Sequence, residues 1–416
     1  MEDFWFLLGI VMILTFIAFI GRNLFDMAQT LRWVPVLDPR KASPLPTSAP
    51  LISVIVPACN EESVIVQCLR SVLEQDYPHF ELILVNDRST DGTLELATQV
   101  SWGLNHCKVI SIKDLPTGWT GKCHALNVGF QHASGDWIAF LDADTQLEHS
   151  ALRQMLILAT TRQVNMVTLV TKPVLRTFWD KALLPAFMAM SGLLYPLWKV
   201  NLPSNPVASA NGMCYLISRT AYLEIGGHRG VKDLAVEDIG IGKRVKAQGL
   251  GLLFANGTKV AKTRMYEGAG AIIDGWSRIV AASINYKIVP ILWAFFFHMF
   301  MSVPFMVVAF FLYFPTAKNM WPNVWFILPA MVLVGFSVLA FTYCSFIGVP
   351  KKYGFLLLLG HFMLTAVFIL AIKRVLTKDP LTWRGTIYDS IRCHPKQLEP
   401  IPTYMEQRGK ITEVLH

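Results

Sequence analysis

Hydrophobic residues gather at the two ends of this chain of 416 residues, while the middle alternates short apolar runs with polar loops. One uncharged run extends from Phe4 to Ile20, and three more follow at Ile288–Phe314, Val324–Ile347 and Gly354–Ile372. Each C-terminal run could span roughly 30 Å of hydrocarbon, and the N-terminal run is of marginal length. The pattern therefore predicts a membrane protein with a water-soluble middle. Its predicted parts are a transmembrane helix at 1–21, a linker at 22–50, a soluble domain at 51–287, three membrane segments within 288–372 and a tail at 373–416.

The first run has one alternative, a cleaved signal peptide. Such a peptide needs a basic start and a cleavage site of small residues, whereas Glu2 and Asp3 precede this run and Gly21-Arg22 follows it. We therefore expect a retained helix.

Charge predicts the orientation of the chain in the membrane. Lys and Arg outnumber Asp and Glu in the middle domain, so the positive-inside rule places that domain in the cytoplasm and the N-terminus outside. Strict alternation of four spans then puts the tail outside, although it carries eight Lys or Arg residues. Either one C-terminal run lies in the membrane without crossing it, or the tail is external despite its charge.

The segment 182–200 is apolar but is interrupted by Pro185 and Pro196. A span here would place the two halves of the middle domain on opposite sides of the bilayer. The sequence therefore favours an interfacial segment, and the alternative is a buried core helix.

Strands and helices alternate in the middle domain. Apolar runs at 52–57, 80–85 and 137–141 predict strands, and amphipathic segments follow the first two. This β-α-β order predicts a parallel sheet that binds its ligand at the carboxyl ends of the strands.

Acidic residues follow the third predicted strand directly, as Asp142-Ala143-Asp144. Two carboxylates at the end of a buried strand are costly without a cation, and hard divalent ions bind carboxylates together with phosphates. The pattern therefore suggests a metal site for a nucleotide diphosphate, with a solvated acidic turn as the alternative. Lys122, in a Gly-flanked loop, could reach a phosphate.

A second acidic pair, Glu237-Asp238, stands among apolar residues. A carboxylate at the mouth of an apolar site can act as a general base, and the alternative is an acidic helix N-terminus that stabilises the helix dipole. Trp276 and Arg278 lie just before the membrane segments, where they could hold a sugar or diphosphate or could anchor the chain at the interface.

Four motifs in this order carry a family resemblance: Pro57-Ala58-Cys59-Asn60-Glu61, Asn86-Asp87 with Asp91-Gly92-Thr93, Asp142-x-Asp144, and Glu237-Asp238. In this combination the chain resembles glycosyltransferase family 2 from about Leu51 to Arg278. The resemblance implies an α/β GT-A fold, here with transmembrane helices at both ends. It also implies inverting transfer from a nucleotide-activated sugar, and a divalent metal, Mg or Mn.

The resemblance also implies roles for single residues. Pro57, Asn60 and Glu61 would line the base and ribose pocket, and Asp87 would contact the base. Asp142 would contact the ribose, Asp144 would bind the metal, and Asp238 would be the catalytic base. Lys122, Glu237, Trp276 and Arg278 complete the predicted nucleotide-sugar site.

Within the family, the chain looks most like bacterial membrane enzymes that glycosylate carotenoids and hopanoids, and is similar also to ceramide glucosyltransferases. Polysaccharide synthases usually carry a Q/R-x-x-R-W motif after the acidic base, and here no Arg-Trp pair follows Asp238 in this region. This departure favours transfer of one sugar to a lipid acceptor, and the donor expected from similar enzymes is a UDP-sugar. Alternatives are a polyprenyl-phosphate sugar synthase, a processive polysaccharide synthase, and an inactive transferase-like scaffold.

Composition argues against several other classes of protein. Hydrophobic residues make up 53% of the chain, which excludes disorder. The net charge of +8 indicates anionic lipid rather than nucleic acid, because no basic stripe with interleaved aromatic residues occurs. The seven cysteines include no C-x-x-C pair, so neither a disulfide framework nor a zinc site is supported.

Overall fold

A computed structural model describes residues 2–41, 49–266, 268–283, 286–313, 324–377, 381–383 and 386–388. The chain divides into two compact units, each assembled from separate stretches. We call them the helical unit (Met1–Trp33, Leu175–Trp198 and Tyr266–Asp379) and the sheet unit (Val34–Val174, Lys199–Met265 and Pro380–His416).

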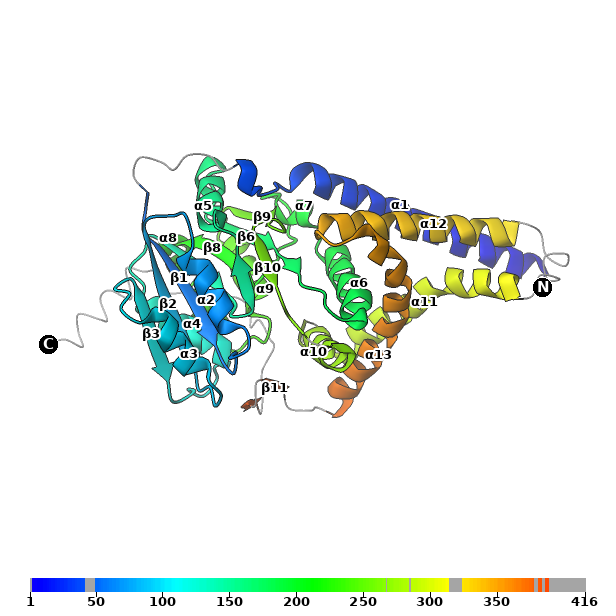
Figure 1. Cartoon of the computed structure of the whole chain (residues 1–416). Helices are drawn as coiled ribbons and strands as arrows, with labels where there is room; N and C mark the ends of the chain where they lie inside the picture. Colours follow the sequence, from blue (N-terminus) through cyan, green and yellow to red (C-terminus); the bar gives the residue numbers. More distant parts are fainter. Residues whose placement is uncertain are drawn as a thin grey trace. The chain divides into compact units, whose positions relative to one another are not determined.

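The sheet unit is built on seven strands in the order β3-β2-β1-β4-β8-β6-β9 (Figure 1). The strands are β1 Ile52–Ala58, β2 Phe80–Asp87, β3 Cys107–Ile112, β4 Trp137–Leu141, β6 Met166–Val170, β8 Cys214–Ser218 and β9 Leu252–Asn256. All neighbours are parallel except β8, which runs antiparallel to β4 and β6. The three predicted strands are therefore confirmed, and the predicted parallel sheet becomes a mixed one.

The sheet unit also contains helices that flank the seven-stranded sheet, and shorter strands that form two separate sheets. The helices are α2 Ile65–Leu73, α3 Thr93–Ser101, α4 Gly121–Gln131, α5 Ala151–Thr161, α8 Arg219–Glu224 and α9 Glu237–Ala247, with short 3₁₀ helices η1 Pro39–Lys41 and η2 Gly227–Val231. A three-stranded sheet joins β5 Thr145–Leu147, β10 Ala261–Thr263 and β7 Lys172–Pro173, and a hairpin joins β11 Leu381–Trp383 to β12 Thr386–Tyr388. Along the chain, the short helix α7, Leu197–Val200, contains the point at which the helical unit ends and the sheet unit resumes.

The core of the sheet unit lies between β1, β2 and β4 on one side and α2, α3 and α5 on the other. On the opposite face α4 packs closely, since a Cβ on Gly129 would stand 2.4 Å from the Ile55 side chain. Such close packing fixes the carboxyl ends of the strands, where the candidate residues lie.

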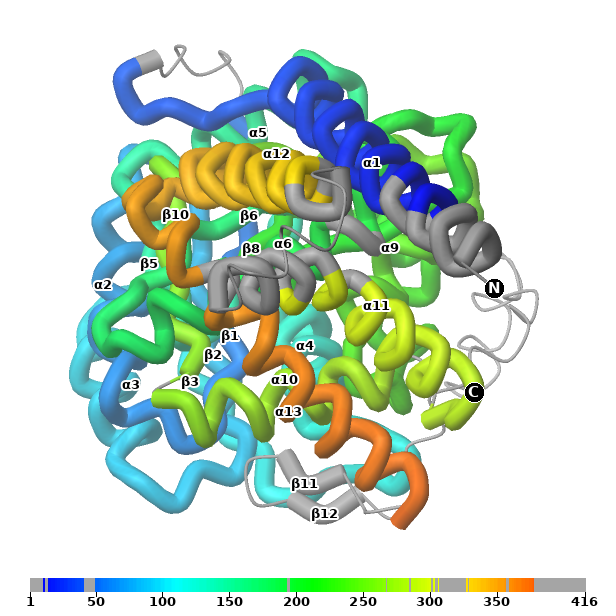
Figure 2. The backbone as a smooth tube through the Cα atoms, turned by 90° about the vertical axis from the view of Figure 1, so that its right-hand side faces the viewer, coloured from blue at the N-terminus to red at the C-terminus, as the bar shows by residue number. Residues whose placement is uncertain are grey.

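The helical unit contains α1 Glu2–Trp33, α6 Phe178–Leu194, α10 Gly268–Ser283, α11 Ile288–Tyr313, α12 Val324–Phe346, η4 Lys351–Phe355 and α13 Leu356–Thr377. Figures 1 and 2 both show α1 and α12 side by side. In the described part of the chain, Pro329–Phe346 and Leu359–Thr377 are long and apolar enough to cross a membrane, and Ile288–Phe300 is a shorter apolar stretch. The described residues of α1 hold no such stretch, so the N-terminal span stays a prediction.

Two predicted boundaries differ from the structure. Helix α1 continues to Trp33, through the first part of the predicted linker, and residues 42–48 of that linker lie outside the described residues. The stretch of the sheet unit that begins at Lys199 ends at Met265 rather than at residue 287, because α10 packs with the other helices. Most of the predicted tail, from residue 389, also lies outside the described residues.

The predicted interfacial segment 182–200 forms most of α6, with Pro185 inside the helix. Ala182, Leu183 and Phe187 are buried, and the Phe187 ring stacks on Trp276 of α10. The buried side of α6 agrees with the second interpretation of this segment, a buried core helix. Contact of its other side with a membrane stays a prediction.

Candidate active site

The loops that follow β1 and β2 bind each other through side chains. The Asn60 amide donates to Ser89 Oγ at 3.0 Å, and Asn60 Oδ1 accepts from the Thr90 amide at 2.8 Å. The Glu61 amide donates to Thr93 Oγ1 at 2.7 Å. Asn60 has a φ of 55°, a backbone conformation that asparagine tolerates better than most residues. The first two sequence motifs thus form one connected edge of the sheet.

Asp87 is the last residue of β2, and its side chain is buried. The guanidinium of Arg88 pairs with both carboxylate oxygens, at 2.8 and 3.1 Å. Pro57 lies on the neighbouring strand, in register with Val85. The charge of Asp87 is therefore matched within the protein, and its predicted contact with a nucleobase stays a prediction.

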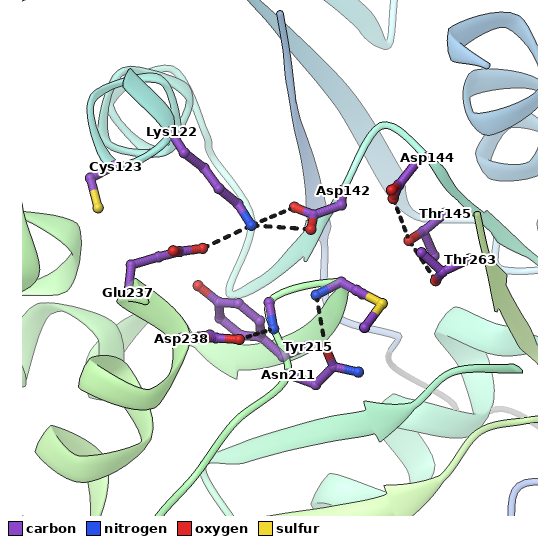
Figure 3. A network of polar contacts seen from close by, with 12 residues as sticks. Lys122, Cys123, Asp142, Asp144, Thr145, Asn211, Tyr215, Glu237, Asp238 and Thr263 are labelled. Atoms are coloured by element: carbon purple, nitrogen blue, oxygen red, sulfur yellow. Dashed lines mark hydrogen bonds and ion pairs between the residues drawn. The ribbon is translucent and has the colours of Figure 1, made fainter. Parts of the chain in front are cut away.

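Lys122 joins two of the predicted acidic sites (Figure 3). It lies in the first turn of α4, and its Nζ is 2.8 Å from Asp142 Oδ1 and 2.8 Å from Glu237 Oε1. Burial alone would lower the pKa of Lys122, but the charges of Asp142 and Glu237 raise it well above its usual value. The ammonium is charged and held by two carboxylates, so contact with a phosphate, as predicted, would require some of these bonds to be exchanged.

Asp238 lies beside this cluster in the first turn of α9. Its Oδ2 accepts from the Gly212 amide at 2.7 Å and its Oδ1 from the Ile239 amide at 2.8 Å. Burial raises the pKa of Asp238 to about 7, and the neighbouring charge of Glu237 acts in the same direction. A carboxyl that titrates near neutral pH suits a general base, and its place at a helix N-terminus fits the electrostatic alternative as well.

Gly212 closes the cluster from a third direction. A Cβ at this position would stand 3.2 Å from each of three polar atoms: Lys122 Nζ, Glu237 Oε1 and Asp238 Oδ2. The turn is fixed by Asn211, whose side-chain amide donates to the Leu169 carbonyl at 2.7 Å. The absence of a side chain at 212 therefore leaves the space in which the charged groups meet.

The predicted metal ligand, Asp144, lies apart from this cluster. Its Oδ1 accepts from Thr145 Oγ1 at 3.3 Å, whereas Asp142 turns toward Lys122 (Figure 3). Within the described residues, no three His, Cys, Asp or Glu side chains gather into a metal cage. Mg²⁺ is commonly held by one or two carboxylates together with substrate phosphates. A single carboxylate at Asp144 fits that second arrangement.

Trp276 and Arg278, two further predicted site residues, belong to α10 in the helical unit. The Trp276 ring stacks on Phe187 with centroids 4.3 Å apart, and Arg278 Nη1 lies 3.2 Å from Asp274 Oδ2. The structure thus gives both residues partners inside the helical unit. Their part in donor binding stays a prediction.

Sequence reasoning missed Gly212 and a buried network behind the cluster. His228 of η2 is fully buried, with Nδ1 2.7 Å from the Tyr222 hydroxyl and Nε2 3.2 Å from the Tyr215 hydroxyl. Burial lowers the pKa of His228 to about 3, so the ring is neutral. The Asn211-Gly212 dipeptide is a turn signal that could have pointed to this loop, whereas the glycine-rich run around the histidine carries no sign of its burial.

Comparison with known proteins identifies the family of one region of the chain. The family model described as glycosyl transferase family 2 matches residues 53–206. This region belongs to glycosyltransferase family 2. The family 2 match includes the first three motifs and Lys122, and Gly212, Glu237 and Asp238 lie beyond its end.

Curated relatives extend the comparison. The chain is 28% identical over 241 residues to the 4,4'-diaponeurosporenoate glycosyltransferase of Staphylococcus aureus (strain USA300), covering 57% of this chain and 63% of that protein. The same protein from strain N315 is 28% identical over 230 residues, which cover 55% of this chain and 60% of that protein. The match thus spans less than two thirds of each relative. These relatives and the family 2 match support a transferase, as the sequence predicted, and agree with the predicted likeness to carotenoid glycosyltransferases.

A solved structure supports the fold. The mannosyltransferase PcManGT from Pyrobaculum calidifontis, solved in complex with GDP-Man and Mn²⁺, aligns with a TM-score of 0.51 over 88% of this chain and 99% of that one. Its sequence identity is 19%, so the likeness concerns the fold. The chain described here has a GT-A-like mixed α/β sheet.

Proposed function

We propose that the chain transfers one sugar from a nucleotide-sugar, with inversion, to a lipid acceptor dissolved in the membrane. A UDP-sugar is the proposed donor, and a carotenoid, a hopanoid or another glycolipid precursor is the proposed acceptor. The observation that carries this proposal is the convergence of Asp238, Glu237, Lys122 and Asp142 beside Gly212 in a family 2 transferase.

In this mechanism Asp238 is the base. Two backbone amides orient its carboxylate, and its raised pKa lets it accept a proton near neutral pH. An acceptor hydroxyl attacks the anomeric carbon from the face opposite the nucleotide and transfers its proton to Asp238. The bond from the anomeric carbon to the diphosphate breaks in the same displacement, which inverts the configuration.

The leaving diphosphate needs positive charge. Lys122 is the protonated cation of the cluster, and Asp144 would hold a divalent Mg or Mn ion together with the donor phosphates. The ion, when bound, would neutralise charge on the diphosphate. The solved PcManGT complex contains GDP-Man and Mn²⁺, which supports testing both GDP donors and Mn²⁺ on this chain.

The lipid acceptor is proposed from the apolar helices and from the relative. Two helices of the described chain are long and apolar enough to cross a membrane, and the S. aureus relative is named for a carotenoid acid. We propose a multi-pass protein of the cell membrane with its sheet unit in the cytoplasm. A hydrophobic acceptor could then reach the enzyme without leaving the lipid.

The test is nucleotide release by the detergent-purified full chain. UDP- and GDP-sugars are offered with and without bacterial lipid extract, and with and without Mn²⁺. We expect turnover with one donor that requires both the lipid and the metal. Turnover without lipid would overturn the lipid acceptor, and silence across the panel would favour the scaffold alternative.

A further inference from the structure

Helices α1, α11 and α12 form one apolar bundle, which we call the spanning bundle. The Phe16 ring of α1 stacks on Phe300 of α11 with centroids 4.5 Å apart. Ile20 of α1 packs so closely on α12 that a Cβ on Gly335 would stand 2.5 Å from it. Neither the run 4–20 of α1 nor α11 nor α12 contains an Asp, Glu, Lys or Arg. These helices suit the hydrocarbon of a bilayer.

Helix α13 takes a different course. Figure 1 shows it running across α1 and α12 rather than alongside them. The chain turns tightly between α12 and α13, with Gly348 at a φ of 74° and with Gly354 against the Phe341 ring. Membrane-crossing helices tilt by about 0–40° from the bilayer normal. Helices that run across each other do not all meet that limit.

Close packing holds α13 near its start, and polar partners hold it near its end. Near its start, a Cβ on Gly360 would stand 2.3 Å from the Ala182 carbonyl oxygen of α6. Near its end, the Arg374 guanidinium forms an ion pair with Asp274 of α10 and donates to Ser277 Oγ at 3.0 Å. Helices α6 and α10 have 17 and 16 residues, so at roughly 1.5 Å per residue both are shorter than a bilayer core of about 30 Å.

The outer face of α13 is an apolar stripe. Its large exposed apolar side chains recur every three or seven residues, which places them on one side of the helix: Leu359, Phe362, Ile369 and Leu376. Lys373 is exposed near the same end as Arg374. The side of α13 that faces the protein is apolar as well, with Leu364, Val367 and Phe368 buried, so the stripe is the part of the helix that is left to contact lipid. At the start of α6, exposed Phe178 and Trp179 match the aromatic residues of membrane interfaces.

We propose that α13 lies along the membrane interface on this stripe, and that the chain crosses the membrane three times, through α1, α11 and α12. Composition alone admits α13 as a span, and its course across α1 and α12 assigns it otherwise. The tail, with its eight Lys or Arg residues, then lies on the same side as the sheet unit, in agreement with the positive-inside rule. This inference rests on the membrane location proposed above.

Reporter fusions test the topology. The full chain carries green fluorescent protein or alkaline phosphatase at its C-terminus in a bacterial host, and a second pair of fusions carries the reporter inserted after Lys318, between α11 and α12. We expect fluorescence and no phosphatase activity at the C-terminus, and the reverse at Lys318. Phosphatase activity at the C-terminus would overturn the proposal. Fluorescence at both positions with the protein in the soluble fraction would instead overturn the membrane location.

Nitroxide labels measure the depth of the stripe directly. Single cysteines replace Phe362, Ile369 and Leu376 in a full chain whose own cysteines are serine, reconstituted in phospholipid vesicles. An interfacial helix gives the three labels equal relative accessibility to oxygen and to a nickel chelate. A crossing helix would change the depth by roughly 20 Å between the first and last label, and that gradient would contradict the proposal.

Discussion

Three carboxylates lie near one ammonium group at the candidate site, and two of them bond to it. Lys122 bonds directly to Asp142 and Glu237, while Asp238 is held by backbone amides. Because Asp238 has no direct cationic partner among these contacts, burial and the charge of Glu237 dominate its titration. Asp142 and Glu237 are thus paired with a cation, whereas Asp238 is the carboxylate that can exchange a proton near neutral pH.

The substitution Asp238→Asn should lower sugar transfer by at least about 100-fold, because an amide cannot accept the proton. Donor binding should survive, since the amide keeps nearly the same shape. Transfer rates and equilibrium donor binding measure the two effects. Asp114→Asn, at an exposed loop residue, is the matched control and should leave both unchanged. Full activity in Asp238→Asn would refute the assigned base.

The transfer rate should rise with pH through about 7 and then level off, because the base must be deprotonated and the pKa of Asp238 is raised to about 7. The charge of Lys122 lowers the pKa of Asp238. Lys122→Met should therefore move the midpoint of the pH–rate profile to higher pH. The groups around Asp238 that could also contribute are Glu237, Tyr215 and, through Lys122, Asp142. An unmoved midpoint would show that Asp238 does not control the profile.

Gly212→Ala should reduce the transfer rate by roughly 10- to 100-fold, because a methyl group would displace the three polar atoms around it. Since these atoms belong to the proposed chemical step, the rate constant should fall more than the donor affinity. Gly270→Ala, where no heavy atom lies within 4 Å of the added carbon, is the control. Steady-state kinetics of both variants measure the effect, and equal transfer rates in Gly212→Ala and Gly270→Ala would contradict the prediction.

At this scale the sequence predicts charged groups better than the backbone that orients them. Asp142, Glu237 and Asp238 stand out because carboxylates in apolar surroundings are costly. Gly212 does not, because its importance comes from three side chains distant in sequence that meet beside it. The pairing of Asp87 with Arg88 was hidden for a similar reason, since adjacent residues meet only in particular backbone conformations, here with Arg88 at a φ of 56°.

At the scale of elements, buried polar contacts fix how strands start. Glu81 of β2 accepts from Ser53 Oγ of β1 at 2.7 Å and from Lys108 Nζ of β3 at 2.9 Å, and also from the Ser134 amide just before β4. Ser53 Oγ in turn accepts from the Gly135 amide at 2.8 Å. One carboxylate thus links the amino ends of four strands.

Glu81→Ala should lower the free energy of unfolding by about 1–3 kcal/mol, because buried donors lose their acceptor. Burial alone would raise the pKa of Glu81, but the bonds from Lys108, Ser134 and Ser53 lower it overall. Its stabilisation is therefore present above the unfolded value, about 4.3, and is lost as the pH falls through the lower folded value. Thermal unfolding in detergent should show a deficit at pH 7 that shrinks in acid. Glu95→Ala, at an exposed residue, is the control.

The sequence predicts the first three strands because each is a short apolar run that ends in polar residues. It does not predict that β8 runs antiparallel between β4 and β6, since periodicity carries no information on strand direction. Helix α1 extends beyond its apolar run because Asn23, Asp26 and Thr30 turn inward, and Asp26 accepts from Trp198 Nε1 at 2.9 Å. The polar residues after Ile20 suggested a linker, but their contacts with the rest of the helical unit stabilise a helix that continues to Trp33.

At the scale of the whole molecule, the two units interrupt each other. The sheet unit stops at Val174, α6 follows as part of the helical unit, and the sheet unit resumes at Lys199. The sequence predicted the apolar segment but not its partners, because α10 and α13 are made much later in the chain. Domain limits drawn along the sequence therefore could not match the units.

The interruption predicts how truncations behave. A chain of residues 34–265 keeps α6 but lacks α10 and α13, which exposes apolar side chains such as Leu183 and Phe187. We expect it to aggregate without detergent. Replacement of residues 175–198 by a flexible Gly-Ser linker should restore a monodisperse protein. Size-exclusion chromatography compares the two, and a soluble, monodisperse chain with α6 intact would contradict the prediction.

The position of α6 also sets an order of events during biosynthesis. A ribosome releases α6 before β8 and β9, so the sheet is still incomplete when this apolar helix emerges. Its partner α13 ends at Thr377, long after α6 has been made. The growing chain must therefore keep α6 in lipid or on a chaperone until α10 and α13 have been made. A premature stop before α13 would then damage maturation of the protein even though every candidate catalytic residue had already been made.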